Sequence, residues 1–232
     1  MDNLSFSPHP KPHTTVVLAM SADGKIADRM RSPARFGSTA DKAHLEHQVA
    51  LVDAVLFGKG TLDAYGTTLP ITSPQLLQQR QQQGKPTQPW QIVCSASGDI
   101  SPKFKFFQQP VPHGLLTTAA GKQQNTAPFE QIIVAPTIND NLDWVNAFEQ
   151  LTLLGIQRIA VIGGGELVSS LIQENLIDEF WLTICPLILG GSQSPTPVAG
   201  QGFLAAVAPQ LQLLEVQKIE QEIFLHYRVL PK

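Results

Sequence analysis

The sequence predicts a single α/β domain with a central, mostly parallel sheet, flanking helices and a C-terminal antiparallel hairpin. Short β-branched apolar runs alternate with helix-like stretches along most of the chain, which is typical of a sheet covered on both faces. The last two runs alternate apolar and polar residues around a polar tip, the pattern of a hairpin. With 232 residues and 43% hydrophobic content, the chain can bury a sizeable core.

The N-terminal quarter of the chain predicts two strands and one helix. The run TTVVLAM (14–20) predicts a strand buried on both faces, and SADGK after it predicts a turn. A helix is predicted over 39–52, with Thr39 as its N-cap. DAVLFG (53–58) predicts a second buried strand, closed by the glycine-bearing GKGT.

The rest of the chain continues the alternation after one polar interruption. Residues 70–89 are rich in Gln, Pro and Ser and predict a solvent-facing excursion rather than a second domain. Strands are predicted at WQIVCS, GLLTT, QIIVA, RIAVIG and DEFWLTICPLILGG, and the hairpin pairs LQLLEVQKI with EIFLHYRVL. Helices are predicted at LDWVNAFEQLTLLG, closed by Gly155, and at ELVSSLIQENL. The domain is expected to span 14–232 after a flexible N-terminus at 1–13.

Charge and cysteine usage narrow the class of partner. Lys and Arg number 16 against 19 Asp and Glu, a formal charge of −3, so no polycationic surface suits nucleic acid or an anionic membrane. Cys94 and Cys185 lie in separate apolar runs and predict buried thiols. The histidines His44 and His47 share a helix face but have no third ligand, so we predict surface residues and no metal. Without an apolar leader or membrane span, a cytoplasmic protein with a small-molecule partner is expected.

The stretch RIAVIGGGELVSSL places three glycines between a predicted strand and a predicted helix. Such a loop presents free backbone N–H groups and the positive end of a helix dipole, so a phosphate could bind there. The motif lacks the third glycine of GxGxxG and the ending of a P-loop. Glycines that only allow a tight turn and close packing would look the same, and the loop by itself does not choose between these interpretations.

Two further stretches extend this motif into a pattern. LAMSADGKIA (18–27), DAVLFGKGT (53–61) and the segment 161–191 occur in this order, and together they resemble the RibD C-terminal domain family. This family is the reductase domain of riboflavin biosynthesis and shares the dihydrofolate-reductase fold. The resemblance covers about 14–230 apart from the Gln-rich insertion. It implies NADPH as reductant and the homodimer that is frequent in the family, and a stand-alone reductase is expected because no deaminase domain precedes the match.

The resemblance also implies which residues contact the cofactor. In such proteins the glycine loop faces the pyrophosphate and the first two motifs approach the nicotinamide half; here these are Gly163, Gly164, Gly165, Glu166 and Leu167, with Ala19, Met20, Gly58 and Thr61. Strand ends would bring Ser95, Ser97 and Thr117 to the adenosine half, although ordinary loop hydroxyls would look the same.

The implied chemistry is reduction of the ribose of an aminouracil ribosyl phosphate to ribityl, with hydride passing to C1′ of the opened sugar or its imine. Asp23 and Lys25, in the SADGK loop, are the predicted catalytic pair that binds substrate or assists proton delivery; an Asp-Gly turn also has a purely structural interpretation. Arg35 and Tyr65 are the predicted substrate-binding residues. Other nearby cations compete with Arg35 for the substrate phosphate: Arg31, Lys42 and Lys59.

Three positions depart from the family pattern on the substrate side. The riboflavin enzymes commonly carry an arginine near Val49, a DDP stretch where this chain has AYGTT (64–68), and a glutamate at Ile162. Substrate identity is therefore open. A reductase of another heterocycle, such as a pterin or dihydrofolate, and a nucleotide-binding protein without turnover are the alternatives. A homodimer is expected because the apolar hairpin would otherwise form an exposed sheet edge.

Overall fold

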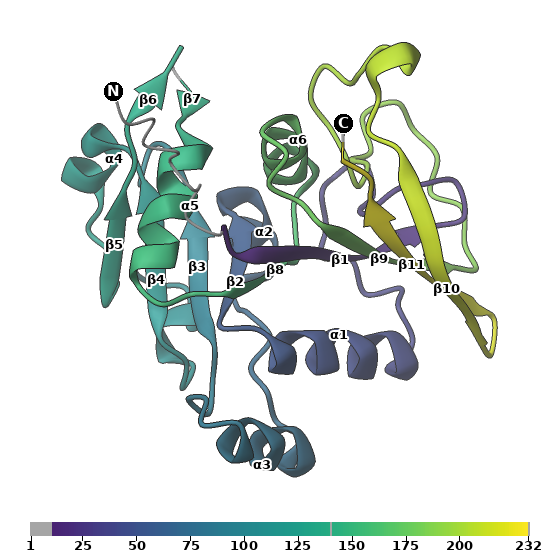
Figure 1. Ribbon diagram of the computed structural model, residues 1–232, viewed down its shortest axis with the longest axis horizontal. Coiled ribbons are helices and arrows are strands. Elements are labelled where there is room, and N and C mark those ends of the chain that lie inside the picture. The colour runs from purple at the N-terminus through teal and green to yellow at the C-terminus, as the bar shows by residue number, and fades with distance from the viewer. Residues whose placement is uncertain (1–10, 140, 232) are drawn as a thin grey trace, which may run out of the picture.

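The computed structural model describes residues 11–139 and 141–231 and consists of one large sheet covered by helices (Figure 1). In spatial order the sheet contains β10 (Leu211–Ile219), β11 (Glu222–Val229), β9 (Glu179–Cys185), β1 (His13–Ser21), β8 (Arg158–Val161), β2 (Ala54–Gly58), β3 (Trp90–Cys94), β4 (His113–Thr117) and β5 (Gln131–Val134). All pairings from β9 to β5 are parallel, whereas β9–β11 and β10–β11 are antiparallel. The predicted fold class and C-terminal hairpin are confirmed.

The helices form a layer on each face of the sheet. They are α1 (Thr39–Leu51), α2 (Lys59–Tyr65), α3 (Pro74–Gln82), α4 (Ala119–Gln124), α5 (Trp144–Leu153) and α6 (Gly165–Gln173), with short 3₁₀ turns η1 (Lys105–Gln108) and η2 (Ala205–Val207). A small hairpin of β6 (Thr137–Ile138) and β7 (Asn141–Leu142), which the sequence pattern did not predict, precedes α5.

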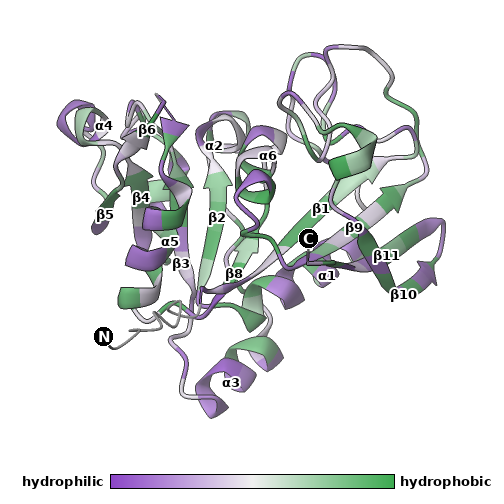
Figure 2. Cartoon of the chain, turned by 45° about the horizontal axis from the view of Figure 1, so that its top comes forward, coloured by the Kyte–Doolittle hydropathy of each residue, from purple (hydrophilic) through white to green (hydrophobic). Residues whose placement is uncertain are grey.

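Two hydrophobic cores follow from the alternation of side chains along the strands. On one face Leu56 of β2 joins a cluster with Phe148 of α5 and Leu171 of α6. On the other face Phe57 joins a cluster with Val49 of α1 and residues of α2 and η1. Figure 2 shows the central strand β2 in the green of apolar residues, and much of α3 in the purple of polar ones. The sheet is therefore buried on both faces, as its near-continuous apolar strands predict.

Helix α1 begins at the predicted residue but has a different cap. Ser38, not Thr39, is the N-cap, because its hydroxyl accepts hydrogen bonds from the N–H groups of Ala40 and Asp41 at 3.1 and 3.2 Å. Thr39 is the first residue of the helix itself. A serine or threonine at either position satisfies the same sequence rule. Only the backbone conformation decides which of the two caps the helix.

The Gln-rich stretch is not simply a solvent-facing excursion, and that prediction was wrong in part. It contains α3, whose Arg80 side chain is only 1% exposed. The Arg80 guanidinium donates hydrogen bonds to the carbonyls of Ala50 and Val52 at the C-terminal end of α1 and to the carbonyl of Pro86. These carbonyls have no partner within α1, so Arg80 supplies a C-terminal cap from another element.

Other boundaries agree with the sequence within a few residues. Gly155 follows α5 with φ of +81°, as expected for a glycine that ends a helix. β1 begins at His13, and Lys11 forms an ion pair of 2.7 Å with Asp178, so ordered chain precedes the expected start at residue 14. The remainder of the predicted N-terminal segment, 1–10, lies outside the described residues. Within the described part of the chain, no helix has both the length and the apolar character needed to cross a bilayer.

Candidate functional site

A cavity of about 780 Å³ opens at the carboxyl ends of the central strands. Its walls come from β1 and the ends of β2 and β3, from α2 and the N-terminal parts of α1 and α6, and from the segments around 25–34, 141–144 and 192–200. β8 lies between β1 and β2 in the sheet, so these two strands, which follow one another in the chain, lie on opposite sides of β8. In open α/β sheets such a crevice is where ligands bind.

Most residues that the sequence analysis selected do line this cavity. They are Ala19, Lys25, Gly58, Thr61, Tyr65, Ser95, Gly163, Gly164, Gly165, Glu166 and Leu167. Met20, Asp23, Arg35, Ser97 and Thr117 are not among the lining residues.

The three glycines of the loop differ in how much space surrounds them. A Cβ on Gly163, whose φ is +146°, would lie 2.8 Å from Oγ1 of Thr61, and a Cβ on Gly165 would lie 2.2 Å from the carbonyl oxygen of Thr196. A Cβ on Gly164 would meet nothing closer than 3.6 Å. Two of the glycines are therefore required for packing, whereas Gly164, the N-cap of α6, borders open space.

The loop is tied to the neighbouring strand end through the backbone. The N–H of Gly58 donates to the carbonyl of Gly163 at 3.0 Å, which joins the second motif to the third. Helix α6 has no side-chain N-cap, so its first N–H groups are free to bind an anion. A dinucleotide pyrophosphate fits this arrangement because the donors are backbone groups and Gly164 leaves room for phosphate oxygens.

The predicted adenosine contacts are less favourably placed. Thr117 is fully buried, and its hydroxyl donates to the carbonyl of Ala96 at 3.3 Å. The Ser95 hydroxyl lies 3.4 Å from that of Ser97 and accepts from the N–H of Gly98. Of the three, only Ser95 lines the cavity. Cofactor contacts of Ser97 and Thr117 stay predictions without geometric support.

Asp23 is occupied by contacts within the protein. Its carboxylate accepts hydrogen bonds from the Ser21 hydroxyl at 2.6 Å and from the N–H groups of Leu189 and Gly190 at 3.0 and 2.7 Å. The Ser21 hydroxyl and these N–H groups lower the pKa of Asp23 to about 2. A carboxylate held ionised in this way is a poor proton donor near neutral pH. The contacts favour the structural interpretation of the Asp-Gly turn over the predicted catalytic role.

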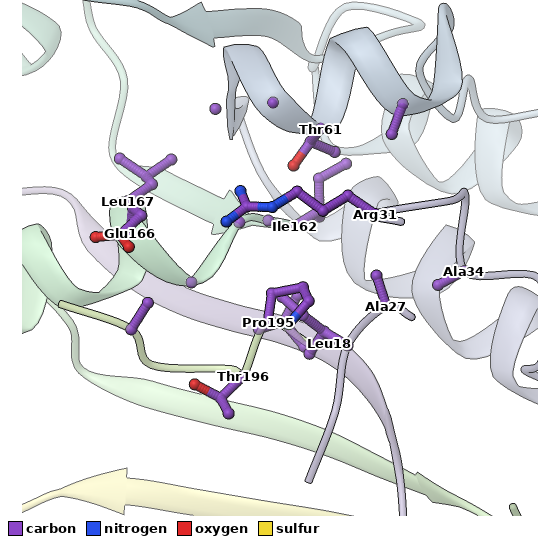
Figure 3. Close-up of a pocket in the computed structure, with 18 of the residues that line it drawn as sticks. Leu18, Ala27, Arg31, Ala34, Thr61, Ile162, Glu166, Leu167, Pro195 and Thr196 are labelled. Carbon is purple, nitrogen blue, oxygen red and sulfur yellow. The ribbon is translucent and has the colours of Figure 1, made fainter. Parts of the chain in front are cut away.

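Three cations line the cavity within the described part of the chain: Lys25, Arg31 and Lys59. Lys25 Nζ lies 3.4 Å from the carbonyl oxygen of Ser194, and Lys59 is paired with Asp63 at 2.6 Å. Figure 3 shows the Arg31 side chain extending across the cavity, between Thr61 and Pro195, toward Glu166 and Leu167. Arg31 is thus better placed than the predicted Arg35 to meet a phosphate inside the cavity.

Tyr65, a predicted substrate-binding residue, lines the cavity and forms part of its side wall. The Tyr65 hydroxyl donates to the carbonyl of Ala34 at 2.9 Å, which links α2 to the loop that follows β1. Burial raises the pKa of this phenol, so the hydroxyl stays protonated and keeps its donor role.

Sequence reasoning missed one acid, Asp41 of α1, which lines the cavity. The Thr183 hydroxyl of β9 donates to its carboxyl group, and Thr183 is the register partner of Ala19. Asp41 therefore stands over the strand end where the nicotinamide is expected. Burial, reinforced by the charge of Glu222, raises its pKa above the ordinary value. Acidic residues are common in the first turn of helices, where they interact favourably with the helix dipole. The sequence therefore carried no signal that set Asp41 apart as a functional residue.

Of the two histidines, His47 is exposed, as predicted, whereas His44 is not. His44 is half-buried, with its ring 4.6 Å from that of Trp181 and 5.3 Å from that of Phe224, so the expectation of a surface residue was wrong. Burial lowers the pKa of His44 to about 4. No group of three or more candidate metal ligands gathers among residues 11–139 and 141–231.

Comparisons with known proteins agree with this architecture. The profile of the RibD C-terminal domain matches residues 12–225. A 2,5-diamino-6-ribosylamino-4(3H)-pyrimidinone 5′-phosphate reductase from Archaeoglobus fulgidus is 29% identical over 195 residues, which is 84% of this chain and 89% of that protein.

Solved structures extend the likeness to the fold. A pyrimidine reductase-like protein from Corynebacterium diphtheriae superposes with a TM-score of 0.76 at 20% identity, covering 95% of this chain and 93% of that one. Dihydrofolate reductase from Enterococcus faecalis reaches 0.50 at 12% identity, covering 94% and 96%. The match of the family profile across nearly the whole described chain, on a dihydrofolate-reductase-like sheet, establishes that this protein belongs to the RibD C-terminal domain family.

Proposed function

We propose that the protein is an NADPH-dependent reductase that converts the ribose of 5-amino-6-(5-phosphoribosylamino)uracil to ribityl. The observation that carries the proposal is the arrangement of one cavity: the N-terminal end of α6 at Gly164, which has no side-chain cap, and an acid with a raised pKa, Asp41, beside β1. The Archaeoglobus fulgidus relative is named for the 2,5-diamino pyrimidinone form of such a substrate. That form is the second candidate.

The fit of a dinucleotide rests on the protein's own groups. Gly164 and the first N–H groups of α6 would hold the pyrophosphate, and the main chain at Ala19 would meet the nicotinamide amide. When bound, NADPH supplies the hydride for C1′ of the opened sugar. A dinucleotide is expected because a nicotinamide reductant suits the family's reaction. We also propose that the protein prefers NADPH to NADH.

The reaction also needs a proton for the nitrogen of the imine as the hydride adds to C1′. We assign this proton to the carboxyl group of Asp41, because its raised pKa favours the protonated form and its position is beside Thr183 and Ala19. Lys25 and Arg31 would bind the phosphorylated end of the substrate. Tyr65 would hold the loop at Ala34 closed over the same space.

A substrate comparison tests the proposal. NADPH consumption should be rapid with the aminouracil ribosyl phosphate or its diamino form and undetectable with dihydrofolate. Asp41→Asn should lower kcat by about 10²-fold or more, the usual effect of a positioned acid, and leave cofactor affinity unchanged. Asp63→Asn is the matched control, because Asp63 pairs with Lys59 and does not line the cavity. No turnover of either pyrimidine by the unmodified protein would refute the proposal.

We further propose that a second copy of the chain covers the C-terminal hairpin. Leu211, Leu213, Val216 and Ile223 are 39–54% exposed on one face of β10 and β11. β10 is also an edge strand of the sheet. A cytoplasmic location fits the two free, buried cysteines, which suit a reducing compartment.

A further inference from the structure

The C-terminal hairpin contributes a buried carboxylate to the neighbourhood of the cavity. Glu222, the first residue of β11, is only 3% exposed. Its two oxygens accept hydrogen bonds from Ser38: Oε1 from the N–H at 2.8 Å and Oε2 from the hydroxyl at 2.5 Å. The Cys185 thiol of β9 is a further hydrogen-bonding partner. Glu222 is thus held in place by α1 and β9 together.

The same serine connects Glu222 to Asp41. The Ser38 hydroxyl, while donating to Glu222, accepts from the N–H of Asp41 at 3.2 Å and from that of Ala40. Glu222 therefore orients the group that caps α1 and fixes the backbone of Asp41. A negative charge is also favourable at this helix end, because the first N–H groups of α1 carry partial positive charge.

The groups that face Asp41 come from three other elements. Glu222 approaches from β11, Cys185 and Thr183 from β9, and Tyr65 from α2. Burial and the neighbouring Glu222 raise the pKa of Cys185 to about 12, and the phenol of Tyr65 is also shifted upward, so both are neutral near pH 7. Among these neighbours Glu222 is the one whose negative charge raises the pKa of Asp41. A buried charge of the same sign disfavours ionisation of Asp41.

We propose that Glu222 is a positioning residue for the reaction: through Ser38 it fixes Asp41 at the cavity, and the charge of its buried carboxylate acts on the carboxyl group of Asp41. The inference rests on the proposed role of Asp41 as proton donor. It gives the C-terminal hairpin a function in catalysis, although the hairpin itself does not line the cavity. Removing the charge, with the shape retained, should leave the acid in place but allow it to ionise at lower pH.

The pH profile of kcat at saturating NADPH and substrate is the primary test. A general acid loses activity as pH rises through its pKa, so the wild-type profile should fall on the alkaline side. Glu222→Gln should move this fall to lower pH, reducing kcat on the alkaline side by about tenfold while the acid-side plateau stays within twofold. KM for NADPH should not change.

Three further variants distinguish the effect of the charge of Glu222 from the effect of its structural contacts. Ser38→Ala removes the cap but keeps the charge of Glu222, so it should lower the melting temperature without moving the alkaline fall to lower pH. Glu222→Asp keeps the charge and should keep the profile. Glu130→Gln removes a similar charge beside His113, at the far end of the sheet, and should change nothing. Identical profiles for Glu222→Gln and Glu222→Asp would overturn the inference.

A titration of the wild-type protein tests the inference without depending on whether any variant folds. The ¹³C signal of the Asp41 carboxyl group should titrate above the ordinary aspartate range. A single step at the ordinary value would overturn the inference even if Asp41→Asn abolishes turnover. If Asp41→Asn stays active while the carboxyl group of Asp41 titrates above the ordinary aspartate range, the proton-donor assignment fails, and with it the catalytic role of Glu222. The two failures are therefore distinguishable.

Discussion

The hydroxyl of Thr61 occupies the space that a side chain on Gly163 would need. A Cβ at Gly163 would lie 2.8 Å from Oγ1 of Thr61, and the φ of +146° at this glycine is one that residues with a Cβ rarely adopt. The glycine loop is thus packed closely against Thr61 of α2. It distinguishes Gly163, which the fold requires, from its neighbour Gly164, which borders the cavity.

Substituting alanine at these two glycines should therefore have unequal effects on stability. Gly163→Ala should lower the free energy of unfolding by about 1–2 kcal/mol, through the unfavourable φ and the contact with Thr61. Gly164→Ala should change it far less, because its Cβ would meet nothing closer than 3.6 Å. Urea denaturation of both variants checks this. Equal losses would mean that the loop tolerates a side chain equally at both positions.

A charge at Gly164 should affect cofactor binding. Gly164→Asp places a carboxylate at the N-terminal end of α6, where the pyrophosphate is proposed to bind, and should weaken NADPH binding by about 2 kcal/mol or more through like-charge repulsion. Gly164→Ala is the matched control for added bulk. Calorimetry with NADPH and NADH provides the measurement. Unchanged affinity in a folded Gly164→Asp protein would mean that the loop serves packing alone.

Asp23 should matter for stability more than for turnover. Its pKa in the folded protein is about 2, below the ordinary value of 3.8, so its stabilising effect is present above pH 4 and is lost as pH falls toward 2. Asp23→Asn should lower the melting temperature at pH 7, lose this difference near pH 2, and keep kcat within a few-fold. A hundredfold loss of kcat without loss of stability would restore the catalytic role expected from the sequence.

Arg31 and Arg35 should differ in their effect on substrate binding. Arg31→Ala should raise KM for the phosphorylated substrate by about tenfold, because it removes a cation from the cavity, whereas Arg35→Ala should change KM little. The dephosphorylated substrate is the control, and with it the Arg31→Ala variant should match the parent. Equal effects on both substrates would indicate that Arg31 shapes the cavity rather than binding phosphate.

The hairpin should mediate association. We expect a homodimer of about twice 25.2 kDa, and Val216→Lys should shift it toward monomer by burying an unpaired charge in the interface. Gln217→Lys adds the same charge on the opposite face of β10 and should leave the dimer intact. Sedimentation velocity at micromolar concentration distinguishes the species. A monomeric parent protein would contradict the proposal.

The sequence by itself determined the parts of this protein that depend on local pattern. Continuous apolar runs such as Val16 to Leu18 predict strands buried on both faces, and the alternation in the last two runs predicts the hairpin. The glycine motif likewise lay where it was expected, between β8 and α6. In each case the determining interactions are between residues close in the chain or follow from one repeating burial pattern.

The tertiary structure alone decided which side chains share the cavity and which satisfy one another. Asp23 and Asp41 are both acids in polar stretches, yet one is bound by the N–H groups of Leu189 and Gly190 and the other lies at the cavity. Ser38 meets Glu222 across 184 positions of sequence. Such pairs depend on strand order and register across the whole sheet, and no local pattern in one sequence encodes which distant residue will neutralise or desolvate a given carboxyl group.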